Sequence, residues 1–126
     1  KKIETPEDLA DIIPAVFKKR ESIEPTLSAA MNSRLGYEIR RTEFEKRAQA
    51  LEEILRPATE HLSRRDAAWL TDVVLVLNSY AAVRAFHDYL GLNTEEAAKR
   101  VAWAIRMLSK AARTANEKGG SEKPQE

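Results

Sequence analysis

The chain lacks cysteine altogether, which excludes disulfides, thiolate metal sites and thiol nucleophiles. Glycine and proline are also scarce, with four and five copies, and most of them stand where helices should begin or end. The longest strongly apolar stretch, residues 73–77, is far shorter than the roughly 20 residues that cross a bilayer. Neither sign of charge dominates, because 21 Lys and Arg face 20 Asp and Glu. The chain therefore has no uniform positive field to hold nucleic acid by electrostatics alone.

The remaining composition is that of one globular domain. The chain has 126 residues, of which 43% are hydrophobic and 33% charged, enough for a single core. Its first residues, from Lys1 to Thr5, turn acidic at once and contain no apolar signal-peptide core. We therefore expect a cytoplasmic protein with no membrane span.

The spacing of apolar residues predicts an all-α antiparallel bundle of about five helices and no strands. Thr5 with Pro6, Ser63 with Asp66, and Gly91 supply helix start and stop signals. The first expected helix follows Thr5, and the second follows Pro25 and ends at Gly36. The third runs from about Tyr37 to Arg56, the fourth from Ser63 to Gly91, and the fifth from Asn93 to about Asn116.

The expected fourth helix has more apolar residues than one stripe can hold. One stripe is wide enough to face the domain's own core. It contains Trp69, Leu70, Val73, Val74, Leu77 and Ala81. A second, narrower seam lies roughly opposite and has small residues at its centre, which permit close helix approach. It contains Leu75, Ser79, Ala82, Phe86 and Leu90.

The last expected helix repeats this arrangement. Its core stripe contains Ala97, Val101, Ala104, Ile105, Leu108 and Ala112. Trp103 and Met107 share another face with Glu96 and Arg100, the mixture of aromatic, thioether and charged residues found in interface cores. We therefore expect a homodimer with a four-helix interface built from the last two helices. The expected interface residues are Leu75, Ser79, Ala82, Phe86, Leu90, Arg100, Trp103 and Met107. Two alternatives are that a third layer of the same chain covers these seams, or that Trp103 is a tolerated exposed aromatic.

The sequence shows no arrangement typical of catalysis. Its two histidines, His61 and His87, stand apart, and neither has a glutamate three residues before it, as di-iron bundles require. Ser79 has no identifiable base, and the few glycines form no phosphate-binding loop. We therefore expect no enzyme, no metal and no cofactor.

Several stretches resemble TetR-family transcriptional regulators. Residues 89–98, which read YLGLNTEEAA, and residues 101–108, which read VAWAIRML, are similar to the end of many such proteins. Residues 64–86 resemble the family's penultimate helix, and residues 5–55 resemble the helices that enclose its effector cavity. The resemblance covers nearly the whole chain, and it consists of helix order, caps and small residues.

The resemblance implies that residues 1–116 form the effector-binding and homodimerisation domain of a repressor, followed by a polar flexible tail at 117–126. The family's last two helices build its dimer. Its regulators begin with a helix-turn-helix of about fifty residues that this sequence does not contain. The resemblance thus implies that DNA is contacted only through an absent N-terminal domain.

The resemblance implies a small apolar effector, and helical bundles place such sites between helices. For each apolar residue that could line the site, plain core packing is the alternative. Helical wheels turn six apolar residues toward the shared interior, and Asn78 and Tyr80 are the nearest polar groups. The expected ligand-binding residues are Phe17, Met31, Phe44, Trp69, Val73, Leu77, Asn78 and Tyr80. The alternative function is a dimeric helical scaffold or protein-interaction module without a ligand.

Overall fold

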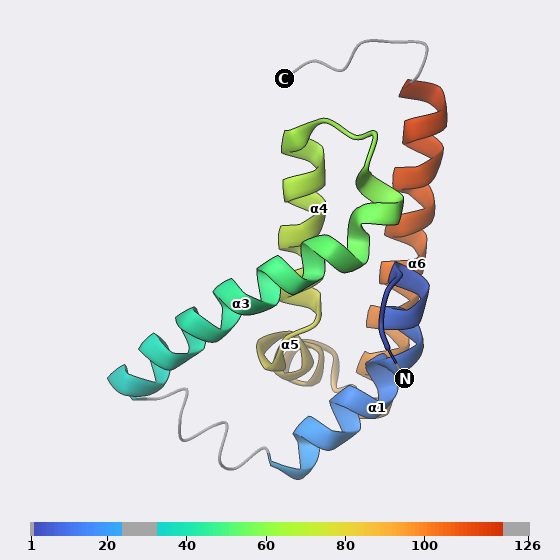
Figure 1. Ribbon diagram of the computed structural model, residues 1–126. Helices are drawn as coiled ribbons and strands as arrows, with labels where there is room; N and C mark the ends of the chain where they lie inside the picture. The colour runs from blue at the N-terminus through green and yellow to red at the C-terminus, as the bar shows by residue number, and fades with distance from the viewer. Residues whose placement is uncertain (1, 24–32, 120–126) are drawn as a thin grey trace.

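A computed structural model describes residues 2–23 and 33–119, and every regular element in these two ranges is a helix (Figure 1). The helices are α1 (Pro6–Ser22), α3 (Arg34–Thr59), α4 (Arg64–Leu77), α5 (Tyr80–Leu90) and α6 (Thr94–Gly119). The expected all-α class is confirmed. The short helix expected after Pro25 falls mostly on residues 24–32, which are outside the described ranges, and so does Met31. The expected tail begins within α6, because that helix continues through residues 117–119.

Side-chain caps explain why the helices begin where the sequence predicts. The Thr5 hydroxyl accepts a hydrogen bond from the Asp8 amide at 3.1 Å, with Pro6 in the first helical position. The Ser63 hydroxyl does the same for the Asp66 amide at 3.0 Å. At the end of α5, Gly91 adopts a left-handed φ of 67°, where a side chain would be strained.

The start and end of α3 differ from the prediction. Gly36 was expected to end the second helix, but it lies in the first turn of α3. The hydroxyl of Ser33 accepts a hydrogen bond from the Gly36 amide at 2.9 Å and so caps α3 upstream of that glycine. The helix also continues past Pro57 to Thr59. Proline so close to the end removes one backbone hydrogen bond without stopping the last turn.

The prediction of one continuous helix from Ser63 to Gly91 is wrong. Helix α4 ends at Leu77 and α5 begins at Tyr80, with Asn78 and Ser79 between them. Ser79 has extended backbone angles, φ −132° and ψ 159°, and its hydroxyl accepts a hydrogen bond from the Ala82 amide at 3.2 Å. Serine side chains compete for backbone groups in this way, and here the hydroxyl of Ser79 also donates to the carbonyl of Val76, so the competition breaks the helix.

The break changes which faces are buried. Trp69 and Val73 were expected to face the core, but they are 60% and 48% exposed, and Val74 is the fully buried residue of α4. Phe86, expected on an outer seam, packs against the core from α5. Within α4, Trp69 and Val73 form one edge of the expected stripe, and the core contacts the other edge, which carries Leu70, Val74 and Leu77. For α5, the two non-helical residues remove the angular reference that one uninterrupted helix would give.

The core is centred on α1 and α6, which run side by side in opposite directions (Figure 1). Its buried residues are Leu9, Ala10, Ile13, Phe17, Leu51, Leu55, Val74, Ala98, Val101, Ala102 and Ile105. Two salt bridges flank this contact, Asp11 to Arg106 at 2.9 Å and Glu7 to Arg113 at 2.6 Å. Most of the expected stripe of the last helix is therefore buried against α1.

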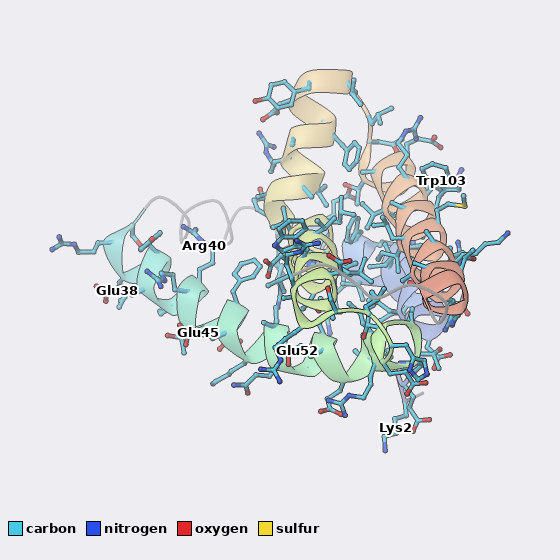
Figure 2. The ribbon with its side chains drawn as sticks, turned by 90° about the horizontal axis from the view of Figure 1, so that it is seen from above. Lys2, Glu38, Arg40, Glu45, Glu52 and Trp103 are labelled. Atoms are coloured by element: carbon cyan, nitrogen blue, oxygen red, sulfur yellow. The ribbon has the colours of Figure 1, made fainter. Side chains whose placement is uncertain are left out.

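The first half of α3 projects away from this core (Figures 1 and 2). Its buried residues are Leu51, Leu55 and Ala58, all in the second half of the helix. No residue from 34 to 50 is buried, and Ile39 is 54% exposed. One face of this projecting half lines the candidate site.

Candidate functional site

A cavity of about 540 Å³ lies between the projecting half of α3, the end of α1 and the start of α5. This volume is within the range of sites that hold small molecules. The described residues that line it are Arg20, Ile23, Gly36, Ile39, Arg40, Glu43, Phe44, Arg47, Ser79, Tyr80 and Ala81. Apolar side chains and guanidinium groups therefore meet in one place.

A single face of α3 forms one wall of the cavity. Its lining residues, from Gly36 to Arg47, are separated by three, one, three, one and three positions. This spacing keeps all of them on the same side of an α-helix. Figure 2 shows Arg40 on one side of α3 and Glu45, which does not line the cavity, on the other.

Three arginines contribute to the lining, and two of them have unsatisfied donors. The Nη1 atoms of Arg20 and Arg40 are buried and have no hydrogen-bond partner. Each guanidinium of the three stacks on a ring of its own helix: Arg20 on Phe17 at 5.6 Å, and Arg40 and Arg47 on Tyr37 and Phe44 at 5.5 Å. Cation–π contacts of this kind orient the guanidinium plane but accept no hydrogen bond from its N–H groups.

The electrostatic surroundings of Arg20 are unfavourable to its charge. Burial, together with the positive charge of Arg47, lowers the pKa of Arg20 to about 10. Two arginines from different helices thus lie close enough to repel each other. The cavity therefore concentrates positive charge. At two of its guanidinium nitrogen atoms, the Nη1 atoms of Arg20 and Arg40, the described residues supply no hydrogen-bond acceptor.

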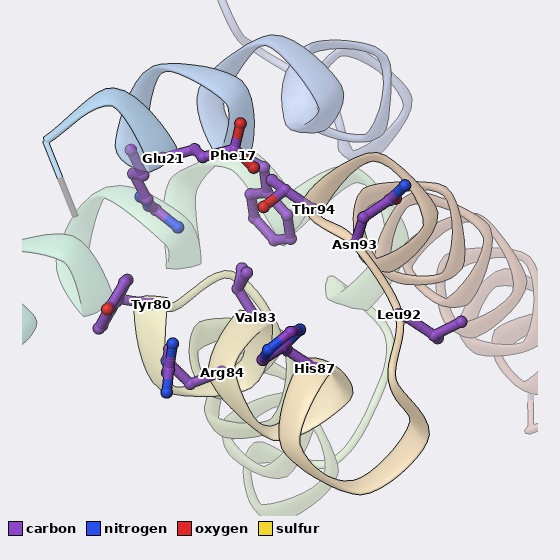
Figure 3. A pocket seen from close by; sticks show the side chains of 10 residues that line it. Phe17, Glu21, Tyr80, Val83, Arg84, His87, Leu92, Asn93 and Thr94 are labelled. Carbon is purple, nitrogen blue, oxygen red and sulfur yellow. The ribbon is translucent and has the colours of Figure 1, made fainter.

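A second cavity, of about 360 Å³, adjoins the first and shares Arg20 and Tyr80 with it (Figure 3). Phe17 from α1 and Val83 from α5 point toward each other across this space. Its rim is polar. The polar residues are Arg20, Glu21, Tyr80, Arg84, His87, Asn93 and Thr94.

The structure brings only some of the expected ligand-binding residues together. Phe44 lines the first cavity, Phe17 the second, and Tyr80 both. Trp69 and Val73 line neither, because they lie on the exposed face of α4.

The other expected ligand-binding residues within the described ranges stand at the break between helices. Leu77 is half-buried against the core. Asn78 ends α4, and its buried Oδ1 atom has no hydrogen-bond partner. Neither residue lines either cavity.

The expected interface residues divide between the interior and the surface. Leu75 and Phe86 pack against the core, Ala82 is half-buried, and Ser79 is buried at the break. Leu90, Trp103 and Met107 remain exposed, at 63%, 63% and 49%. Arg100, also exposed, bonds Glu96 through its Nη1 at 3.0 Å. In Figure 2, Trp103 and the projecting half of α3 lie on opposite sides of the molecule.

The three cavity arginines were not among the expected site residues. Arg40 and Arg47 are seven residues apart, with Gly36, Ile39 and Phe44 on the same helical face. That pattern is present in the sequence, but arginines on a helix are ordinarily assigned to solvent. Arg20 joins them only through the packing of α1 against the other helices, which no local pattern reveals.

Within the described ranges, no group of three or more His, Asp or Glu side chains could hold a metal ion. None of the helices in those ranges is long and apolar enough to span a membrane.

Comparisons with family models, with curated proteins and with solved structures found no match for this chain.

Proposed function

We propose that this chain is an effector-binding and homodimerisation domain, of the kind that the resemblance to TetR-family repressors implies. The observation that carries the proposal is the cavity of about 540 Å³ between α1, α3 and α5, where Ile23, Ile39 and Phe44 line the same space as polar and charged side chains. DNA binding would belong to a segment outside this sequence.

The position of the cavity suits the transmission of a signal. Ser79 and Tyr80 line it and also form the start of α5, next to the break from α4. A ligand shifts a conformational equilibrium only if it binds one arrangement more tightly than another. A ligand touching both the projecting half of α3 and the start of α5 would meet this condition, since their separation sets the cavity's width.

Thermal denaturation with a panel of apolar acids, alcohols and amines tests ligand binding. At a ligand concentration of 100 times Kd, binding to the folded state alone adds about 2.7 kcal/mol. Ile39→Trp should fill the cavity and remove the shift, whereas Glu45→Trp, on the opposite side of α3, should retain it. A panel that shifts neither the wild type nor the control variant would count against ligand binding.

Dimerisation is the second part of the proposal. Trp103 and Met107 are exposed one turn apart on α6, and burying such side chains contributes about 1.5–3 kcal/mol each. A two-fold axis near Trp103 would place Glu96 of one copy opposite Lys110 of the other, because both lie seven residues from it. The same face would then carry complementary charges in both copies.

Sedimentation velocity over a micromolar concentration series tests the dimer. Trp103→Glu should give a monomer, because the new charge would be buried without a partner. Leu35→Glu introduces the same charge at an equally exposed apolar residue on the projecting end of α3, and it should leave the dimer intact. A wild-type chain that stays monomeric throughout would refute this part.

A dimeric scaffold or interaction module without a ligand is the second candidate. It is favoured by additional apolar exposure on α4, where Trp69 and Val76 are 60% and 62% exposed. A dimer that binds nothing in the panel would support this function over the first.

A further inference from the structure

We propose that the cavity between α1, α3 and α5 selects anions: molecules with an apolar body and one carboxylate or phosphate group, held by Arg20, Arg40 and Arg47. The inference rests on the proposed function, since it names the class of effector that the domain would bind.

The charge of the lining favours an anion. The described residues that line the cavity include three guanidinium groups and one carboxylate, that of Glu43. Glu43 also interacts with a lysine outside the lining, because its Oε1 atom lies 3.9 Å from the Nζ of Lys46. The lining therefore carries a positive excess, in a space where the low dielectric strengthens attraction to a bound anion.

The unsatisfied donors specify where the acid group would bind. The Nη1 atoms of Arg20 and Arg40 are buried without an acceptor. Leaving a buried donor unpaired costs free energy, and a carboxylate or phosphate supplies several acceptor lone pairs at once. The planar fork of arginine matches the geometry of these two groups.

Several arginines elsewhere in the described ranges are paired with a carboxylate of the chain. Arg56 pairs with Glu53 at 2.9 Å, and Arg106 pairs with Asp11 at the same distance. Arg113 makes two hydrogen bonds to Glu7. Against this background, Arg20 and Arg40 are distinct in holding buried N–H groups toward a cavity rather than toward a carboxylate.

The aromatic contacts of these arginines do not occupy their donors. The guanidinium carbons of Arg40 and Arg47 lie 5.5 Å from the ring centres of Tyr37 and Phe44, and a ring face accepts no conventional hydrogen bond from them. Ile23, Ile39 and Phe44 line the same space and would contact the apolar body. Charge and apolar surface are thus arranged for an amphipathic acid.

Calorimetric titration of the full chain with three matched probes tests the inference: decanoate, decyl phosphate and decan-1-ol. We expect at least one of the two anions to bind at least about tenfold more tightly than the alcohol. Whichever anion binds more tightly identifies a carboxylate or a phosphate as the natural group. The preference should weaken as salt is added, because ionic contacts at an open cavity are screened.

Arginine variants connect any preference to these residues. Arg40→Gln should reduce the preference for the anion by about tenfold while binding of decan-1-ol is unchanged. Arg40 is on the projecting half of α3, outside the core, and circular dichroism should show an unaltered fold. The matched control is Arg41→Gln, an exposed neighbour that does not line the cavity, and it should keep the wild-type preference.

The outcomes separate this inference from the proposed function. Equal binding of the alcohol and both anions would overturn anion selection and leave effector binding standing. An anion preference that survives Arg20→Gln, Arg40→Gln and Arg47→Gln would overturn the assignment of these residues. Failure of all three probes would overturn the inference, while the wider panel with Ile39→Trp decides effector binding independently.

Discussion

Replacing Arg20 with methionine should make the ligand-free protein more stable. The side chain is half-buried at the end of α1, with one donor lacking a partner and the charge of Arg47 nearby. Methionine keeps an unbranched apolar stem of similar length and can still contact the ring of Phe17. The change therefore removes the charge while preserving most of the packing.

The magnitude follows from the pKa of Arg20, which burial and the charge of Arg47 lower to about 10 in the folded chain. One pKa unit corresponds to about 1.4 kcal/mol, so full conversion gives about 3 kcal/mol. Solvent screens a half-buried group, which reduces the expected gain to about 1 kcal/mol. The folded pKa lies below the unfolded one, so the whole penalty is present at pH 7.

Urea denaturation followed by tryptophan fluorescence at pH 7 measures the gain. We expect the midpoint of Arg20→Met to rise at pH 7 with an unchanged slope, and the melting temperature to rise by about 4 °C. Arg41→Met is the control and should stay within about 0.5 kcal/mol of the wild type. A loss of more than about 1 kcal/mol in Arg20→Met at pH 7 would refute the reasoning, because it would mean that the charge of Arg20 stabilises the empty fold.

Three further predictions concern local structure. The hydrogen bonds from Arg113 lower the pKa of Glu7 below 4.5, so this pair stabilises the fold above that pH and the contribution is lost as pH falls through the lowered pKa. Acid unfolding of Glu7→Gln should therefore differ from that of wild type by about 0.5–1 kcal/mol near neutrality and converge with it once pH falls below the lowered pKa of Glu7, and parallel curves would contradict it. Gly91→Ala should cost about 1 kcal/mol in urea denaturation, mainly from the φ of 67°, since apart from its chain neighbours no atom lies within 4 Å of the added methyl group. Ser79→Ala should cost about 1 kcal/mol by removing the hydroxyl that accepts from the Ala82 amide and donates to the Val76 carbonyl, and hydrogen exchange should quicken in the first turn of α5; an unchanged exchange rate would show that the cap is unnecessary.

Local signals predicted much of the fold. The starts near Thr5 and Ser63 and the left-handed end at Gly91 depend on neighbouring residues, and all three are confirmed. The break at Ser79 was also locally encoded, but the long apolar pattern on either side of it favoured continuity. A capping side chain prevailed over that periodicity.

The candidate site was less predictable because its parts come from distant segments. Phe44 and Tyr80 were expected to contact a ligand, and both line the cavity. Trp69 was placed inside because the expected apolar stripe of α4 was wider than the face that the core covers, and Trp69 lies on its uncovered edge. Arg20 was absent from the prediction, since charged residues are usually assigned to solvent and only tertiary packing buries this one.

The two non-helical residues between α4 and α5 have a mechanical consequence. A continuous α-helix resists bending because each turn is hydrogen-bonded to the next, whereas at Asn78 and Ser79 this series is interrupted and a change in a few backbone dihedral angles can reorient one helix against the other. Because Ser79 also lines the cavity, a molecule bound there would act at the point of lowest bending stiffness. A small rotation of α4 about that point would displace the far end of the helix more than the near end, because the displacement grows with distance from the point of rotation.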